Sequence, residues 1–454
     1  MRIRRVFVAN RGEIAVRIVR ACRELGLECV VGTSDADRTG MAAREADRAV
    51  CIGPGPAGQS YLRDDLVVQA ALGTGCDAIH PGYGFLSERP RLARRARKNG
   101  LVFVGPPAEV MELAGDKLRA RAEAVRTGLP VLPGAQVRSR LEAREVAERI
   151  GFPVLLKAAG GGGGRGIKLA HDSGELATLL GLARSEASAA FGDGRIYVER
   201  FIPAARHIEV QVVADEHGGV TELGERDCSI QRRYQKVIEE APAPSLASSV
   251  REQIRDAGVA FAQSISYRNV GTVEFVLDAA NDAFYFLEMN CRIQVEHPVT
   301  EAVTGADLVC EQLRIADRQR LSVARAQTEP RGHAIECRLT AEDVEHDFRP
   351  TPGTVSRCSI PSLAGLRVDT HCELGTVVPP FYDSLLAKLI GHGRDRGEAI
   401  TVLLEALEHA QIEGVPTNRG LLCKVLSHPD FAAGAVSTNW LAQTLPELQE
   451  VLQP

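Results

Sequence analysis

The chain has 454 residues, of which 44% are hydrophobic and 25% are charged, and this composition indicates a folded globular protein of two or three domains. A net charge of −5 gives no argument for a nucleic-acid partner, and no apolar run is long enough for a signal peptide or a membrane span. The eleven cysteines include no C-x-x-C pair, so we expect buried, reduced thiols and a cytoplasmic protein without membrane contact. One such thiol, Cys51, lies in an apolar run.

The beginning of the chain has the pattern of a β-α-β unit. Apolar runs at 6–9 and 28–32 flank a helical pattern over about 13–25. The segment lacks the G-x-G-x-x-G fingerprint, so a dinucleotide-binding function is unsupported even though the architecture resembles that fold. The sequence therefore predicts a parallel α/β sheet with a different ligand chemistry.

A third predicted strand, 77–80, leads into the glycine-rich turn P-G-Y-G-F-L-S-E. In α/β proteins, ligands bind at the carboxyl edge of the strands, where this turn lies. Tyr83 and Glu88 are therefore candidate ligand contacts. For Tyr83 the alternative is an aromatic side chain packed against the turn.

Five consecutive glycines, Gly160 to Gly164, follow a predicted strand that ends at Lys157. Glycine costs backbone entropy, and a turn between two strands needs only one or two. We interpret the run as a mobile flap whose amide groups close on an anion. A plain flexible linker is the alternative, but the run lies between two strands of one small unit and not between domains.

Two charged segments follow in the chain. Polar residues alternate along 207–212, where His207 is either a ligand contact or a structural histidine. The segment 225–236 carries four cationic side chains. Phosphate capture is the sharper interpretation of this segment, and a solvated charge run is the alternative.

The segment 286–298, F-L-E-M-N-C-R-I-Q-V-E-H-P, has polar residues at every second position. In an extended strand these side chains share one face, where carboxylates, amides and a guanidinium suit a hard cation and anions. A solvent-exposed strand face is the alternative. Because 288 to 296 would span about 26 Å when extended, the segment bends or serves two regions. We assign metal binding to Glu288 and Asn290 and substrate binding to Arg292, Gln294 and Glu296.

A β-hairpin is predicted just before this segment. Alternating strands at 272–277 and 284–288 are joined by a short polar loop. The hairpin can bring Glu274 close to Glu288 and Asn290, although the pattern does not determine the register. Pro298 is expected to end the second strand, because proline cannot donate to a continuing ladder.

Several longer motifs occur in one order, and together they carry a resemblance. They are A-N-R-G-E-I-A, H-P-G-Y-G-F-L-S-E, G-D-K, L-K-A-A-G-G-G-G-G-R-G, E-R-D-C-S-I-Q-R-R-Y-Q-K, E-M-N-C-R-I-Q-V-E-H-P-V-T-E and G-H-A-I-E-C-R. Over nearly the whole chain they resemble biotin carboxylase, of the ATP-grasp superfamily. The resemblance implies an N-terminal Rossmann-like parallel sheet (1–115), an ATP-grasp domain (116–330) with a mobile glycine-rich lid (about 132–202), and a C-terminal α+β domain (331–445).

The implied activity is ATP-dependent carboxylation of biotin by bicarbonate, through carboxyphosphate and with Mg²⁺ or Mn²⁺. The chain shows no A-M-K-M biotin-attachment motif, so the biotin carrier and the carboxyltransferase are expected on separate polypeptides. In the family, residues such as Arg17, Arg20 and Glu24 lie at a two-fold contact, which implies a homodimer. We expect the first half-reaction of acetyl-CoA or acyl-CoA carboxylase. The alternatives are another two-subunit carboxylase such as pyruvate carboxylase, an ATP-grasp carboxylate–amine ligase, or a degenerate scaffolding subunit.

The resemblance also implies roles for individual residues. ATP contacts are expected at Lys117, Lys157, Gly163, Gly164, Glu199, Arg200, Phe201, Ile202, His207, Gln231, Tyr234, Glu274 and Glu288. The metal ligands are expected to be Glu274, Glu288 and Asn290. Bicarbonate is expected at Lys236, Arg292, Gln294 and Val295, and biotin at Tyr83, Arg292 and Arg338. The catalytic set is Lys236, Arg292, Glu296 as general base, and Arg338 as the stabiliser of the biotin enolate. Three positions depart from the family pattern: Tyr234 replaces a usual His, Arg200 a Lys, and Cys291 a Thr.

Overall fold

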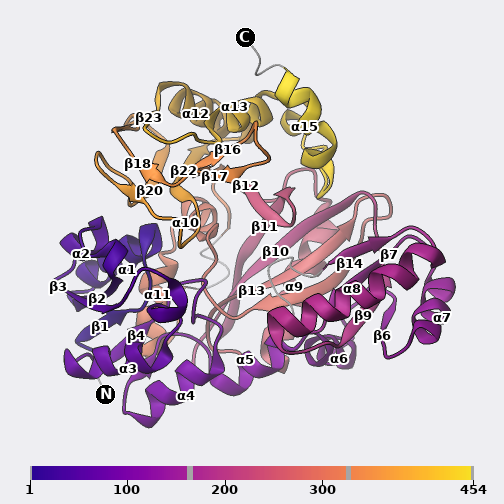
Figure 1. The fold of residues 1–454 in the computed structure, drawn as a ribbon, viewed down its shortest axis with the longest axis horizontal. Coiled ribbons are helices and arrows are strands. Elements are labelled where there is room, and N and C mark those ends of the chain that lie inside the picture. The colour runs from indigo at the N-terminus through magenta and orange to yellow at the C-terminus, as the bar shows by residue number, and fades with distance from the viewer. Residues whose placement is uncertain (1–2, 161–166, 324–328, 451–454) are drawn as a thin grey trace.

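The computed structural model describes residues 3–160, 167–323 and 329–450 (Figure 1). Its N-terminal part contains a parallel five-stranded sheet in the order β3-β2-β1-β4-β5. The elements here are β1 (Arg5–Val8), α1 (Gly12–Glu24), β2 (Glu28–Ser34), α2 (Met41–Glu45), β3 (Arg48–Gly53), α3 (Asp64–Gly73), β4 (Ala78–His80), α4 (Pro90–Lys98), β5 (Val102–Phe103) and α5 (Ala108–Gly115). The Rossmann-like parallel sheet predicted from the sequence is confirmed.

Strand β3 forms one edge of this sheet and carries Cys51, whose predicted burial is not confirmed. Cys51 is exposed, although its apolar neighbours favoured burial. Among the described residues this edge strand pairs with β2 alone, so it is covered less completely than the central strands. All eleven cysteines are free thiols, and most of them are buried as predicted.

A small unit with its own core follows the helix α6. Its four strands form an antiparallel sheet in the order β6-β9-β7-β8, and α7 and α8 pack against it. The elements are α6 (Lys117–Arg126), β6 (Gly134–Val137), α7 (Arg140–Ile150), β7 (Val154–Ala158), β8 (Lys168–Ala170), α8 (Ser173–Phe191) and β9 (Ile196–Arg200). This unit spans the predicted lid. The predicted ATP contacts Gly163 and Gly164 lie outside the described residues.

The central and C-terminal parts of the chain share one eight-stranded sheet, in the order β14-β13-β10-β11-β12-β15-β22-β20. Strand β15 pairs with β12, so this sheet continues across the expected domain boundary at 330. Its central elements are β10 (Ala205–Ala214), β11 (Val220–Arg232), β12 (Gln235–Ala241), α9 (Ser248–Ser264), β13 (Asn269–Asp278), β14 (Ala283–Asn290), α10 (His297–Thr304) and α11 (Leu308–Ala316).

The C-terminal segment adds three strands, β15, β22 and β20, to that sheet and surrounds them with helices and three small sheets (Figure 1). Its elements are β15 (His333–Thr340), β16 (Glu342–Asp343), β17 (Arg349–Pro350), β18 (Gly353–Thr354), β19 (Arg357–Ser359), β20 (Leu366–Thr370), β21 (Val377–Val378), β22 (Leu385–Gly393), α12 (Arg396–His409), β23 (Gln411–Glu413), α13 (Arg419–Ser427), α14 (Pro429–Ala432) and α15 (Trp440–Glu450). Within the described ranges, no helix combines the length and apolarity needed to cross a membrane.

Strand β10 shows how the sheet positions the site. Its apolar residues, among them Ile208 and Val210, pack in a core with α9, while His207 and Glu209 have the opposite parity. The predicted alternation is therefore confirmed. The polar face is nevertheless buried, because Arg226 and the helix α10 cover it. A buried polar face requires partners for every charge, and these partners form the site.

We predict that Gly332→Ala destabilises the protein by clashing with the neighbouring strand. The backbone φ of Gly332 is +73°, and an added Cβ would lie 2.0 Å from the carbonyl oxygen of Gly393. Gly100 is the matched control, because its φ is +75° and its Cβ would meet nothing within 4 Å. Gly100→Ala should cost only the left-handed penalty of about 1–2 kcal/mol, and Gly332→Ala about 1–3 kcal/mol more. Equal urea midpoints for the two variants would contradict the clash.

Candidate active site

The centre of the site is the ammonium group of Lys236, which β12 places among three carboxylates. Its Nζ lies 2.5 Å from Glu209, 3.2 Å from Glu274 and 2.5 Å from Glu296. Burial opposes the charge of Lys236, but the carboxylates outweigh burial and hold its pKa well above the usual value. In the same way, burial raises the pKa values of Glu274 and Glu296, but nearby cations, Lys236 foremost, bring them below the usual range. The acids of this cluster are therefore ionised at neutral pH.

The hairpin β13–β14 brings the predicted metal ligands together. Glu274 and Glu288 are direct cross-strand partners, and Asn290 Nδ2 donates to Glu274 over 2.7 Å. The predicted proximity of these three residues is confirmed. Lys117, at the start of α6, forms an ion pair with Glu288, while Lys236 contacts Glu274. Two ammonium groups thus occupy the positions beside these carboxylates that a divalent cation would take, and the oxygen donors suit Mg²⁺.

The strand ends earlier than its alternating pattern predicted. β14 stops at Asn290, and the chain then bends through an irregular stretch until α10 begins at His297. The polar face of the strand therefore does not reach Glu296, and the bend that the sequence predicted as one of two alternatives is confirmed. The carboxylate of Glu88 accepts the backbone N–H of Cys291 at 2.8 Å, where a continuing strand would need a ladder partner. Pro298 lies in the first turn of α10 and does not end a strand.

Beyond the bend, Arg292 is held by polar groups on several sides. Its Nε donates to Glu88 at 3.1 Å, one Nη donates to Gln294 at 2.8 Å, and the other lies 3.3 Å from the oxygen of Asn290. Glu88 was a sequence candidate, and it acts here through this arginine. Among the described residues, the buried Nε2 of Gln294 has no hydrogen-bond partner, so it remains available to an acceptor on a ligand.

Arg338, on β15, joins the same cluster from the opposite side. Its Nε donates to Glu239 at 2.6 Å, and its Nη2 lies 3.0 Å from Glu296. Glu296, which is fully buried, is therefore held between Lys236 and Arg338. Sequence reasoning did not select Glu209 or Glu239. The alternation along β10 could have indicated the former, whereas no sequence pattern singled out the latter.

The predicted nucleotide contacts are placed in two groups. Near the cluster, Lys157 pairs with Glu199, and His207 lies 3.4 Å from Glu274. Burial and, to a smaller extent, Lys236 lower the pKa of His207, but Glu274 and Glu209 raise it overall to about 9. Gln231 is also buried, with its Nε2 donating to the carbonyl of Cys228 at 2.8 Å.

Among the described residues, the remaining predicted ATP contacts and the predicted bicarbonate contact Val295 take no part in these ion pairs. Arg200 donates to the carbonyl oxygen of Ile150 at 3.3 Å, and Tyr234 lies at the β11–β12 turn with 47% of its surface exposed. The Phe201 N–H bonds to Pro153, Ile202 is buried beside Leu132, and the Val295 carbonyl accepts from Lys388 at 2.8 Å.

The cationic segment 225–236 does not act as one phosphate-binding group. Arg226 is fully buried and bonds to Glu209 at 2.6 Å, so its charge supports the protein interior. Arg232 and Arg233 both pair with Asp347. Arg226 and Lys236 both contact the carboxylate cluster, whereas Arg232 and Arg233 pair with Asp347, so the prediction that the four cations share one phosphate-binding role is corrected.

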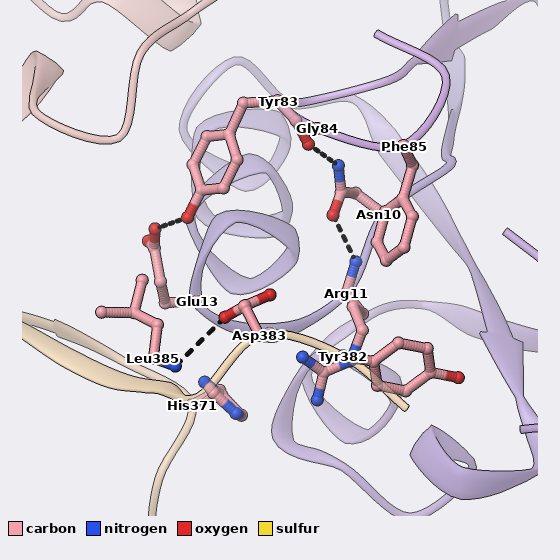
Figure 2. Close-up of a pocket in the computed structure, with 11 residues that line it drawn as sticks. Asn10, Arg11, Glu13, Tyr83, Gly84, Phe85, His371, Tyr382, Asp383 and Leu385 are labelled. Atoms are coloured by element: carbon pink, nitrogen blue, oxygen red, sulfur yellow. Dashed lines mark hydrogen bonds between the residues drawn. The ribbon is translucent and has the colours of Figure 1, made fainter. Parts of the chain in front are cut away.

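A pocket of about 140 Å³ opens beside the glycine-rich turn (Figure 2). Tyr83 lines it, and its hydroxyl contacts the carboxylate of Glu13. Asn10 Nδ2 holds the turn by donating to the carbonyl oxygens of Pro81 and Tyr83, each at 2.6 Å, and His80 Nδ1 accepts the N–H of Gly82 at 3.1 Å. The turn is thus fixed by side chains, and Tyr83 is both packed on it and facing the pocket.

The helix α1 does not present all of its predicted dimer residues on the surface. Arg17 is buried and pairs within the chain with Glu301 at 2.9 Å and Asp307 at 2.8 Å. Arg20 pairs with Glu45 at 3.0 Å but stays exposed. The expectation that Arg17 is a surface contact is therefore corrected, because an internal ion-pair network uses it.

Comparisons with known proteins agree with this architecture. Residues 2–111 match the family "Biotin carboxylase, N-terminal domain", 116–324 match "Carbamoyl-phosphate synthase L chain, ATP binding domain", and 336–443 match "Biotin carboxylase C-terminal domain". The biotin carboxylase of Nostoc sp. is 47% identical, covering 98% of this chain and 99% of the relative. A pyruvate carboxylase subunit of Methanothermobacter thermautotrophicus is 45% identical, covering 96% of this chain and 89% of the relative.

A solved structure gives the same result. The biotin carboxylase domain dimer of 2-oxoglutarate carboxylase from Hydrogenobacter thermophilus, in complex with MgADP, ADP and bicarbonate, has a TM-score of 0.96 and 42% identity over 99% of both chains. The fold and these matches together place the chain in the class of ATP-grasp ligases. Within that class, the chain belongs to the biotin carboxylase family.

We predict that His80 makes the protein less stable as the pH falls. Burial, reinforced by Arg17, lowers the pKa of His80 to about 3. An unfolded histidine titrates near 6.5, so the unfolded state binds the proton first, and stability is lost as pH drops from about 6.5 toward 3. His80→Asn, whose side chain can still accept the N–H of Gly82, should remove about 3–5 kcal/mol of this pH dependence.

Urea unfolding between pH 4 and 7 measures this effect. His171→Asn is the control, because His171 is an exposed histidine. An unchanged pH slope in His80→Asn would show that the buried imidazole does not titrate on unfolding.

Proposed function

We propose that this chain catalyses the ATP-dependent carboxylation of biotin by bicarbonate, with the biotin carried on a separate carrier protein and carboxyphosphate as the intermediate. The observation that carries the proposal is the buried Glu296, held between Lys236 and Arg338. A relative of the same fold is recorded in complex with MgADP and bicarbonate. A carboxylate fixed between two cations stays ionised and can take a proton from bicarbonate within its reach.

The metal end of the site lies on the hairpin. Glu274, Glu288 and Asn290 would hold Mg²⁺ or Mn²⁺, displacing the ammonium groups of Lys117 and Lys236 from the carboxylates. When bound, the ion neutralises phosphate charge and orients the terminal phosphate. The released ammonium groups are then free to contact phosphate and bicarbonate oxygens.

The bicarbonate end lies beyond the bend at Cys291. Arg292 supplies a planar fork of donors, and Lys236 supplies a point charge. Gln294 supplies a buried N–H that is unpaired within the described part of the chain. Glu296 accepts the bicarbonate proton, which makes the oxygen that attacks the γ-phosphate more nucleophilic. Val295 contributes its main chain, which Lys388 fixes from behind.

Biotin would enter from the side of Arg338 and Tyr83. The guanidinium of Arg338 is placed to stabilise the oxyanion that develops on the ureido ring when it is carboxylated. ATP would lie between Lys117, Lys157, Glu199, Ile202, His207 and Gln231. Arg200, which now bonds to the carbonyl oxygen of Ile150, would require a lid movement to reach this position.

Two other functions fit less well. An ATP-grasp ligase that activates a carboxylate for an amine needs the metal and lysine residues but not the set Arg292, Glu296 and Arg338. A degenerate scaffolding subunit would not need this ionised cluster. The final acceptor is proposed to be acetyl-CoA or another acyl-CoA, and the pyruvate carboxylase relative keeps pyruvate as the specific alternative. The carboxyltransferase on a separate chain, the homodimer and the cytoplasmic location stay predictions.

The decisive experiment measures ADP release by the purified protein with MgATP, bicarbonate and free biotin. We expect hydrolysis that depends on bicarbonate and rises further with biotin, together with transfer of labelled carbon from bicarbonate to biotin. Hydrolysis that is indifferent to both substrates would reject the proposal. Hydrolysis that rises with an amine acceptor would favour the ligase alternative.

We predict that Glu288→Gln lowers turnover by more than about tenfold and raises the Mg²⁺ concentration needed for half-maximal activity. The substitution removes one charged oxygen ligand from a cation that neutralises phosphates. Exposed Glu148→Gln on α7 is the control and should leave the titration unchanged. If the Mg²⁺ titration of Glu288→Gln matches the wild type, the metal assignment is wrong.

The two arginines at the substrate end should separate in their effects. Lysine keeps the charge but loses the fork geometry, and loss of a preorganised donor typically costs about a hundredfold. Arg338→Lys should therefore abolish most biotin carboxylation while sparing the slow bicarbonate-dependent ATPase. Arg292→Lys should damage both activities, because Arg292 lies at the bicarbonate end beside Asn290. Equal losses of both activities in the two variants would contradict this division.

A further inference from the structure

Two buried glutamates near Arg338 lie directly opposite each other on neighbouring strands, and neither has a role in the proposed carboxylation. Glu239 on β12 and Glu336 on β15 face each other across the antiparallel pair, and both are fully buried. Cross-strand partners of this kind have Cβ atoms about 4.5–5.5 Å apart, and two like charges in that position repel. One of the two glutamates must therefore differ from an ordinary ionised carboxylate.

The hydrogen bonds show which oxygens lack partners. Glu239 Oε1 accepts from Arg338 Nε at 2.6 Å, whereas Glu239 Oε2 has no partner among the described residues. Neither carboxyl oxygen of Glu336 has one either, within the same part of the chain. An ionised carboxylate only accepts hydrogen bonds, but a protonated carboxyl also donates one. A single proton on Glu336, directed at Glu239 Oε2, would satisfy the unpaired oxygen of its neighbour.

We propose that Glu239 and Glu336 form a proton-sharing acid pair that positions Arg338 for biotin. In this arrangement Glu336 donates to Glu239, and Glu239 in turn holds the Nε of Arg338. The Nη2 of Arg338, which also pairs with Glu239, lies 3.0 Å from Glu296. Because Glu336 is neutral, Arg338 is surrounded by two carboxylate charges and not three, which leaves more of its positive charge for a developing oxyanion. Glu239 and Glu336 are positioning residues, since they act through the arginine.

The charges around the pair are consistent with one retained proton. Burial raises the pKa of Glu336 well above its usual value, the carboxylates Glu239 and Glu296 add to this, and the cations Lys388 and Arg338 oppose it. For Glu239, burial raises the pKa to about 7 against the opposing effect of Arg338. Lys388 does not neutralise Glu336 by direct contact, because its Nζ bonds to the Val295 carbonyl at 2.8 Å and pairs with Glu13 at 3.1 Å.

A pH test follows that does not require activity. An unfolded glutamate loses its proton near pH 4.3, while the folded pair keeps one, so the wild type should lose stability as pH rises above that value. In Glu336→Gln the amide donates to Glu239 at every pH. Its melting temperature should exceed that of the wild type by about 2 °C or more at pH 8, and the difference should shrink toward pH 5.

The next residue of β12 provides a matched control. Glu240 is also buried, but it pairs with His333 at 2.7 Å and with Arg396 at 2.6 Å, and its pKa is lowered despite burial. Glu240→Gln should therefore lower the melting temperature at pH 8, the opposite sign to Glu336→Gln. If both variants shift the melting temperature in the same direction, the shared proton is refuted.

Kinetic measurements test the positioning role, which rests on the proposed function. Glu336→Leu fills the buried position with an apolar side chain of similar size and removes the hydrogen-bond donor to Glu239. The KM for biotin should therefore rise by about tenfold, while the ATPase rate without biotin should change by less than about twofold. Glu336→Gln should restore the biotin KM, and Glu240→Gln should leave it unchanged. Equal biotin KM values for Glu336→Leu and the wild type would overturn the positioning role, as would failure of Glu336→Gln to restore it.

A spectroscopic measurement separates this inference from the proposed function. The infrared spectrum of the wild type at pH 7 should contain the carbonyl stretch of a buried protonated carboxyl, and Glu336→Gln should lack it. Absence of that band from the wild type refutes the acid pair whether or not the protein carboxylates biotin. Presence of the band in a protein that does not carboxylate biotin would instead leave the pair standing and reject the proposed function.

Discussion

The site depends on one constraint: three carboxylates that come from distant parts of the chain converge on a single ammonium group, that of Lys236. Glu209 is supplied by β10, Glu274 by β13 and Glu296 by the end of the bend before α10. Burying such charges is costly unless each one is paired, so the fold that brings the carboxylates together must also supply Lys236.

This cluster is supported from behind by a second buried cation. Arg226 bonds to Glu209, Gln211, Thr272 and Thr300, which lie on β10, β13 and α10. Its five donors fix the relative positions of these three elements, and it has no exposure to a ligand. The division between Arg226 and Lys236 explains why two cations in one charged segment have different roles. Arg226 fixes the framework, and Lys236 holds the three carboxylates together.

The hairpin and the bend after it set the separation between the two ends of the site. A register irregularity after Glu274 lets Glu288 lie directly opposite it, although the neighbouring pair along the ladder is Phe275 with Phe286. The bend beyond Asn290 then returns the chain toward β12 and β15. Without it, Glu296 would continue along the edge of the sheet and could not meet Lys236 and Arg338.

The sequence by itself determined the elements and most of the chemical groups. Alternation identified the polar face of β10 and the hairpin, and the ordered motifs indicated the family with its acids and arginines. Only the tertiary structure decided which groups meet. Local patterning cannot show that Glu88 ends β14 by accepting the N–H of Cys291, because the two residues are distant in the chain. It cannot show that Arg17 is internal, or that Glu239 faces Glu336, because long-range strand pairing and burial set those partners.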